Sequence, residues 1–349
     1  MKRVGILGLA RSGKTTLFEI LMQGAGAAAQ PGASARDRVG VVRVPDPRVD
    51  RLSALFQPKK TVYTQIQFVD SAAAGQGKPG KGQDLFTSVR QCDALVAVVR
   101  DFANEAVPSE KGVDAARDLR ELESELIFND LALCETRIER IDKELRIGKK
   151  QGEAEGVALR RCREALESEH PLRELDFSAE DDRLLRGFQF LTNKPLLVVL
   201  NQDESSTHAP PALGRHALAV TLRAEAEREI VALPPEERAA FRAEMGVAED
   251  GLSLVIRACY ELLGLVSFFT VGPDEVRAWT IHRGDSAVDA AGEIHSDLAR
   301  GFIRAEVIPQ DVLLELGGLA RAREKGVLRL EGREYPVQDG DCVEIRHNA

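Results

Sequence analysis

The sequence lacks the features that mark membrane-spanning, disulfide-bonded and zinc-binding proteins. No apolar run approaches the length that spans a bilayer, and the apolar stretch at the N-terminus is too short for a signal peptide. The five cysteines are scattered, and their odd number favours reduced thiols over disulfides or a zinc site. They are Cys92, Cys134, Cys162, Cys259 and Cys342. We therefore expect a soluble, cytoplasmic protein with no membrane partner.

The sequence also lacks an excess of positive charge and any internal repeat. Its 47 Lys and Arg residues are outnumbered by 56 Asp and Glu, for a net charge of −9. This balance argues against indiscriminate coating of nucleic acid, although it allows a local basic patch. We expect no recognition of a DNA sequence. A chain of 349 residues is long enough for two or three domains with ample core.

What the sequence does contain is a phosphate-binding loop near its N-terminus. The pattern is Gly, four residues, Gly-Lys-Thr, between a predicted strand at 4–7 and a helix that begins near Thr16. Backbone N–H groups and the helix dipole bind phosphate in this arrangement. We expect Lys14 to reach the β- and γ-phosphates and Thr15 to coordinate Mg²⁺. The loop is Gly8-Leu9-Ala10-Arg11-Ser12-Gly13-Lys14-Thr15. The chain is predicted to bind a nucleoside triphosphate.

Further apolar runs with strand character predict an α/β fold with a mostly parallel sheet covered by helices. They lie at 39–44, 65–70, 94–99 and 195–200. The segment 24–38, rich in Ala and Gly, is expected to be a loop. Asp70 ends one predicted strand, where a carboxylate can hold Mg²⁺ through a water. The alternative is that Asp70 only forms a turn, and the upstream phosphate loop favours the metal.

A candidate base-recognition box follows the strand at 195–200. Ligands of open parallel sheets bind at the carboxyl ends of the strands, and here the residues are Asn201-Gln202-Asp203-Glu204. A guanine site normally has Asn-Lys-x-Asp, in which the Asp accepts hydrogen bonds from guanine. Glu204 is longer than this Asp, and Gln202 replaces the Lys. The box therefore favours adenine over guanine.

Two further regions differ in pattern from the sheet. Apolar residues at three- and four-residue steps run from Leu119 to Leu145 and resume from Val157 to Leu166, which predicts an antiparallel helical hairpin. Its distal part, 137–163, has nine Lys and Arg against five Asp and Glu. This basic part is either a solvated face or an RNA contact. From about Ser267, short strands and turns predict a small mixed α+β domain.

Several stretches of the chain resemble the YchF/Obg-like ATPase family of P-loop proteins, and they cover nearly its whole length. They are 39–48 (VGVVRVPDPR), 58–60 (PKK), 68–70 (FVD), 98–100 (VVR), 191–195 (LTNKP), 269–272 (FTVG), 275–281 (EVRAWTI), 290–295 (AAGEIH), 301–306 (GFIRAE) and 337–341 (VQDGD). The family's Asn-x-x-Glu box falls on Asn201 and Glu204.

The resemblance implies three domains. These are a P-loop core at 1–117 and 188–266, an inserted helical hairpin at 118–187, and a C-terminal ubiquitin-like TGS domain at 267–349. It also implies ATP, or GTP, as ligand, Mg²⁺-dependent hydrolysis, and a partnership with the ribosome or its RNA through the hairpin and the TGS domain. The residues predicted to bind nucleotide or metal, or to act in hydrolysis, are Gly8, Ala10, Arg11, Ser12, Gly13, Lys14, Thr15, Thr16, Asp70, Asn201, Gln202, Glu204, Thr221 and Leu222.

The chain departs from the family pattern where hydrolysis would be controlled. The family's Asp-x-Ala-Gly-Leu is Asp70-Ser-Ala-Ala-Ala here, so Ala73 replaces a glycine. The first switch retains only Ser34 as a hydroxyl, and Ser109 stands where the family has a histidine. Arg11, in the loop, either supplies a cation to the phosphates or points to solvent. We predict a slow ATP-hydrolysing switch, with a non-hydrolysing nucleotide-binding scaffold as the alternative. A small-molecule kinase would need a second pocket and an Arg-bearing lid.

Overall fold

A computed structural model describes residues 1–24, 28–31, 37–71, 86–106, 108–109, 111–147, 152–206, 208–247 and 250–348, with backbone only at 28–31, 37 and 71. The chain divides into two compact units. The first comprises Met1–Val42 and Gln67–Leu262, and the second comprises Arg43–Ile66 and Leu263–Ala349. In the part of the chain described, no helix combines the length and the apolar character needed to cross a membrane.

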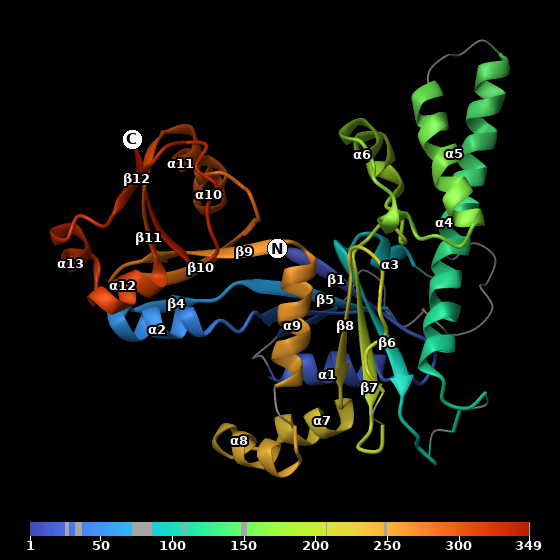
Figure 1. Ribbon diagram of the computed structural model, residues 1–349, viewed down its shortest axis with the longest axis horizontal. Helices are drawn as coiled ribbons and strands as arrows, with labels where there is room; N and C mark the ends of the chain where they lie inside the picture. Colours follow the sequence, from blue (N-terminus) through green and yellow to red (C-terminus); the bar gives the residue numbers. More distant parts are fainter. Residues whose placement is uncertain are drawn as a thin grey trace. The chain divides into compact units, whose positions relative to one another are not determined.

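The first unit is built on a seven-stranded sheet in the order β2-β3-β5-β1-β6-β7-β8 (Figure 1). The pairs β1–β6, β6–β7 and β7–β8 are parallel, and β2–β3 at one edge is antiparallel. The strands are β1 (Lys2–Leu7), β2 (Ala28–Pro31), β3 (Asp37–Arg43), β5 (Gln65–Ser71), β6 (Ala94–Asp101), β7 (Leu196–Gln202) and β8 (Ala217–Leu222). The predicted α/β class is confirmed. The loop expected at 24–38 is wrong in part, because β2 pairs with β3 there.

The core of this sheet packs against helices. Leu95, Ala97 and Val99 of β6 contact one face of a long helix, which buries Leu119 and Leu122 against them. Every residue of β6 is buried, as expected for a central parallel strand. The helices are α1 (Lys14–Gly24), α3 (Thr87–Arg90), α4 (Ala115–Arg146), α5 (Glu153–Glu167), α6 (Ala179–Leu185), α7 (Ala224–Ala232), α8 (Pro235–Glu244) and α9 (Gly251–Leu262), with 3₁₀ turns at Leu172–Glu174 and Arg186–Phe188.

Helices α4 and α5 form the predicted hairpin and lie side by side, as the green ribbons of Figure 1 show. Asp114 caps α4 by accepting a hydrogen bond from the Arg117 backbone N–H at 2.9 Å. The apolar stripe between the helices includes Cys134 and Cys162, both fully buried. Arg137 forms an ion pair with Glu155 across the hairpin at 2.6 Å. Packing of this stripe supplies the stability that the isolated helices would lack.

The second unit contains a six-stranded mixed sheet in the order β12-β11-β13-β9-β10-β4. Adjacent side chains of β9 face opposite sides: Phe268 packs with Ala287 and Ala290, and Phe269 packs with Val49 and Leu52. Helices therefore cover both faces. The elements are α2 (Pro47–Phe56), β4 (Lys60–Val62), β9 (Leu265–Val271), β10 (Glu275–His282), α10 (Ala287–Ile294), α11 (Ser296–Arg300), β11 (Phe302–Pro309), α12 (Gln310–Leu316), α13 (Leu319–Glu324), β12 (Arg329–Glu331) and β13 (Asp341–His347).

The segment Arg43–Ile66 differs from its expected place in the nucleotide-binding domain. Strand β4 pairs in parallel with β10, and the Arg48 guanidinium donates to Asp46 at 2.9 Å and to Asp339 at 2.8 Å. Although burial lowers it, these carboxylates raise the pKa of Arg48. The same guanidinium lies 5.2 Å from the centre of the Phe269 ring. These contacts make the VPDPR stretch part of the C-terminal unit.

Candidate nucleotide-binding site

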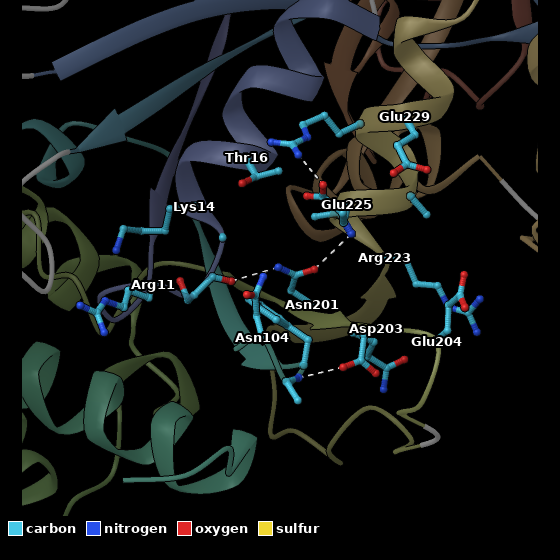
Figure 2. A pocket seen from close by; sticks show the side chains of 18 of the residues that line it. Arg11, Lys14, Thr16, Asn104, Asn201, Asp203, Glu204, Arg223, Glu225 and Glu229 are labelled. Atoms are coloured by element: carbon cyan, nitrogen blue, oxygen red, sulfur yellow. Dashed lines mark hydrogen bonds and ion pairs between the residues drawn. The ribbon is translucent and has the colours of Figure 1, made fainter. Parts of the chain in front are cut away.

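A cavity of about 870 Å³ lies where strands of the first unit end (Figure 2). Its walls come from the segments that follow β1, β6, β7 and β8, which is the carboxyl edge of the parallel sheet. The volume is within the range of small-ligand pockets. The lining residues are Ala10, Arg11, Ser12, Gly13, Lys14, Thr15, Thr16, Phe102, Ala103, Asn104, Asn201, Gln202, Asp203, Glu204, Ser205, Arg223, Ala224, Glu225, Ala226, Arg228, Glu229 and Met245.

The two glycines of the phosphate loop are required by its geometry. Gly8 has φ +153° and Gly13 has φ +103°, and both values are unfavourable for other residues. A Cβ on Gly8 would lie 2.4 Å from the Val98 carbonyl oxygen, and one on Gly13 would lie 2.3 Å from Asn201 Nδ2. The loop is therefore a closely packed backbone cradle. Its Ser12 Oγ is buried and has no hydrogen-bond partner in the described part of the chain. A cradle with an unpartnered hydroxyl fits a phosphate.

Lys14 begins α1 and turns its amine back onto the loop. Its Nζ donates to the carbonyl oxygens of Gly8 and of Leu9, the latter at 2.9 Å. Burial lowers the pKa of Lys14, and the charges of Asp70 and Glu125 partly offset this. Carbonyl oxygens are weaker partners for an ammonium group than phosphate oxygens, which carry charge. Lys14 is thus placed to exchange these two carbonyls for a phosphate.

The two predicted metal-binding residues differ in exposure. Thr15 is exposed and lines the cavity, whereas Asp70, in β5, is 5% exposed and is not among the lining residues. Arg38 donates from Nη2 to Asp70 Oδ2 at 2.6 Å. A hydroxyl and a carboxylate are hard oxygen donors of the kind that Mg²⁺ uses beside phosphates and waters. The donor set therefore fits Mg²⁺, provided that the ion competes with Arg38 for Asp70.

Asn201 connects the phosphate loop to the opposite wall of the cavity. Asn201 is 5% exposed; its Nδ2 donates to the Ser12 carbonyl oxygen at 3.1 Å, and its Oδ1 accepts from the Ala224 N–H at 3.1 Å (Figure 2). Each end of the amide thus has a protein partner. In the structure Asn201 links the phosphate loop to the start of α7. Its contact with the base stays a prediction.

Gln202 lines the cavity, but its side-chain amide nitrogen already has protein partners. Its Nε2 donates to Asp101 Oδ2 at 2.9 Å and to the His208 carbonyl oxygen at 2.8 Å. Burial raises the pKa of Asp101, but hydrogen bonds from Ser206, Gln202 and His208 hold it below its usual value. This ionised carboxylate anchors the segment that follows β7. The side chain of Gln202 therefore links the end of β7 to Asp101 and His208.

Glu204 is the member of the box that remains available to a ligand. Asp203 is occupied, because its carboxylate accepts from the backbone N–H of Ala103 at 2.8 Å and of Ser205 at 2.9 Å. Glu204 is exposed, lines the cavity, and makes no hydrogen bond to any described residue. Its carboxylate can accept from the amino group of a base.

The cavity also contains residues that the sequence reasoning missed. Thr221 and Leu222 end β8, but the lining begins one residue later, at Arg223 and Ala224. The end of β8 at Leu222 could have indicated these residues, because the cavity is lined by the residues that follow the strand. The other lining residues outside the predicted set are Phe102, Ala103, Asn104, Asp203, Ser205, Glu225, Ala226, Arg228, Glu229 and Met245.

The predicted switch positions are described only in part. Ser34 and the alanines at 72–74 lie outside the described residues. Two lysines of the basic part of the hairpin, Lys149 and Lys150, also lie outside them. Ser109 is half-buried and its Oγ donates to the Gly112 carbonyl oxygen at 2.7 Å. Arg11 is exposed, lines the cavity and donates to the Pro108 carbonyl oxygen at 3.0 Å. A contact of Arg11 with the phosphates stays a prediction.

Comparison with known proteins adds independent information. The chain is 41% identical to the Bacillus subtilis "Ribosome-binding ATPase YchF", an alignment that covers 99% of this chain and 98% of that protein. It is 38% identical to the protein of the same name from Escherichia coli O157:H7, over 99% of both. The structure of the Schizosaccharomyces pombe YchF GTPase matches with a TM-score of 0.83 and 25% identity, over 99% of this chain and 97% of that one. A family model named YchF-GTPase_C, described as a protein of unknown function (DUF933), matches residues 265–348.

Proposed function

The chain belongs to the YchF family, and from this membership and the geometry of its phosphate loop we propose that it binds ATP with Mg²⁺, hydrolyses it slowly and acts at the ribosome. The phosphate loop is the observation that carries the proposal. Gly8 and Gly13 bring the backbone N–H groups close to a phosphate, Lys14 neutralises its charge, and Thr15 with Asp70 would hold the metal. Bound Mg²⁺ would neutralise charge on the phosphates during hydrolysis.

The base is the less constrained part of the proposal, since one relative is called an ATPase and another a GTPase. Glu204 is the exposed carboxylate at the proposed base end. It supports adenine because the adenine amino group is a hydrogen-bond donor, whereas guanine presents a carbonyl oxygen at that ring position. Adenine preference is accordingly part of the proposal.

Paired calorimetric titrations with ATP and GTP at matched Mg²⁺, followed by single-turnover hydrolysis, test this function. We expect tighter binding of ATP and a kcat below about 1 s⁻¹. Tight ATP binding without a detectable chemical step would instead favour the scaffold function. The absence of binding by either nucleotide at saturating Mg²⁺ would reject the proposed function.

Ribosome association is supported by the names of the relatives and by the basic distal hairpin. Arg140, Lys143 and Arg146 of α4 are exposed there and can contact phosphates of RNA. Changing all three to Glu should reduce co-sedimentation with ribosomes about tenfold at low salt and leave ATP affinity unchanged. The matched control changes Lys111, Arg215 and Arg257 to Glu; these exposed residues of the first unit lie outside the hairpin and do not line the cavity. An equal loss of co-sedimentation in both triple variants would mean that the hairpin charges only face solvent and do not contact RNA.

A second cavity bears on the kinase alternative. It measures about 590 Å³ and shares Phe102, Ala103, Asp203 and Ser205 with the nucleotide cavity. These shared residues belong to the proposed base end, and none belongs to the phosphate loop. A molecule bound there would contact the wall beside the base, so the cavity does not support phosphoryl transfer to a second substrate.

A further inference from the structure

The carboxylate of Asp70 is already paired with a cation of the chain itself. Arg38, in β3, donates to the single oxygen Oδ2 of Asp70 from both Nη2, at 2.6 Å, and Nε, at 3.1 Å. The Asp70 side chain is 6% exposed and that of Arg38 is 41% exposed. A guanidinium held at two points on a buried carboxylate is a strong, charge-assisted pair. The pair lies at the carboxylate proposed to hold Mg²⁺.

Arg38 also has a second carboxylate within reach. Its Nη1 lies 3.2 Å from Glu19 Oε1, on the exposed side of α1. The guanidinium lies 4.8 Å from the centre of the Phe18 ring, which belongs to the same helix. Glu19 and Phe18 can therefore keep the guanidinium in place when the contact with Asp70 is lost. Arg38, in β3, therefore has a second set of partners on α1.

We propose that Arg38 is a built-in competitor of Mg²⁺ for Asp70, which sets the Mg²⁺ concentration needed for nucleotide binding. The inference rests on the proposed function, because it takes Asp70 as the metal carboxylate. Mg²⁺ and the guanidinium interact with the same carboxylate, so binding of the ion weakens the hydrogen bonds from Arg38 to Asp70 and leaves Arg38 on Glu19, to which its Nη1 already donates. Without nucleotide, Arg38 neutralises a buried charge that would otherwise be costly. With nucleotide, Mg²⁺ takes over that neutralisation.

The test measures ATP affinity by calorimetry across a series of Mg²⁺ concentrations. Removing the competitor in Arg38→Gln should lower the Mg²⁺ concentration at half-maximal affinity by about three- to tenfold, the loss of one partly exposed ion pair. Arg38→Lys keeps the charge but cannot place two N–H groups on one oxygen, so it should give part of that shift. An Arg38→Lys midpoint equal to that of the wild type, beside a shifted Arg38→Gln, would assign the effect to net charge and overturn the proposal.

Two further variants distinguish a direct contact between Arg38 and Asp70 from a general electrostatic effect of one positive charge. Arg215→Gln removes one positive charge from the first unit at an exposed position outside the cavity and should leave the midpoint unchanged. In an Asp70→Asn background the Arg38→Gln shift should disappear, because the pair is already broken. A wild type that binds no ATP at saturating Mg²⁺ would reject the proposed function. If the wild type binds ATP but the Mg²⁺ midpoint of Arg38→Gln equals that of the wild type, only the role of Arg38 is rejected.

Discussion

The two ends of the cavity are built from different parts of the chain. The phosphate end is backbone: Gly8 and Gly13 shape it, and Lys14 lies folded on its carbonyl oxygens. The opposite end consists of side chains, and Asn201 and Gln202 there already have protein partners. A backbone site allows little variation in sequence, because each N–H must lie where phosphate requires it. A side-chain site can change its contacts residue by residue, which leaves base preference adjustable while phosphate binding stays fixed.

The largest effect should come from the charge at the phosphate end. Lys14→Ala should weaken ATP and GTP equally, by more than about 100-fold, because it removes a charge-assisted contact with phosphate that both nucleotides share. Its melting temperature should stay close to that of the wild type. Calorimetry and thermal melts measure the two effects. Lys143→Ala, at an exposed position of α4, is the matched control and should bind normally. Retention of wild-type affinity in Lys14→Ala would contradict the phosphate-loop assignment.

The phosphate end could be read from the sequence because its chemistry is tied to spacing. Eight consecutive residues and their flanks determine the strand, the glycine turn and the helix start at Lys14. The fold class followed from continuous apolar runs, for the same local reason. Asp70 was predicted in the same way, as an acid at the end of a strand; it lies in β5, and its metal role stays a prediction.

The features that could not be predicted from the sequence depend on contacts between residues far apart in the chain. Gln202 reaches Asp101, and Arg38 reaches Asp70, across strands whose register the sequence does not give. Arg43–Ile66 joins the C-terminal unit because β4 pairs with β10, far along the chain. The lining after β8 begins at Arg223, one residue beyond the predicted pair Thr221 and Leu222, because it starts only where the strand has ended.

The second prediction concerns the contact between the two ends. Gly13→Ala places a Cβ 2.3 Å from Asn201 Nδ2 at φ +103°, so the loop and Asn201 must both shift. We expect about 1–3 kcal/mol of destabilisation and at least tenfold weaker ATP binding. Chemical denaturation and calorimetry measure these effects. Gly187→Ala is the control, since a Cβ there meets nothing within 4 Å and its φ is ordinary. Equal stability and affinity in both variants would mean that the two ends are not mechanically connected.

The smallest effect should be a change of selectivity at the base end. Glu204 is exposed and makes no hydrogen bond to a described residue, so Glu204→Ala should leave the melting temperature unchanged. Loss of one acceptor for the adenine amino group should reduce the ratio of ATP to GTP affinity by about three- to tenfold, below the usual value for a buried charged contact because Glu204 is solvated. Glu229→Ala removes the same charge from the lining of the same cavity and should change the affinities for ATP and GTP by the same factor.

An unchanged ratio of ATP to GTP affinity in Glu204→Ala, or an equal change of this ratio in both variants, would mean that Glu204 does not take part in base recognition. Discrimination would then have to come from backbone groups or from neighbours such as Asn104 and Arg223.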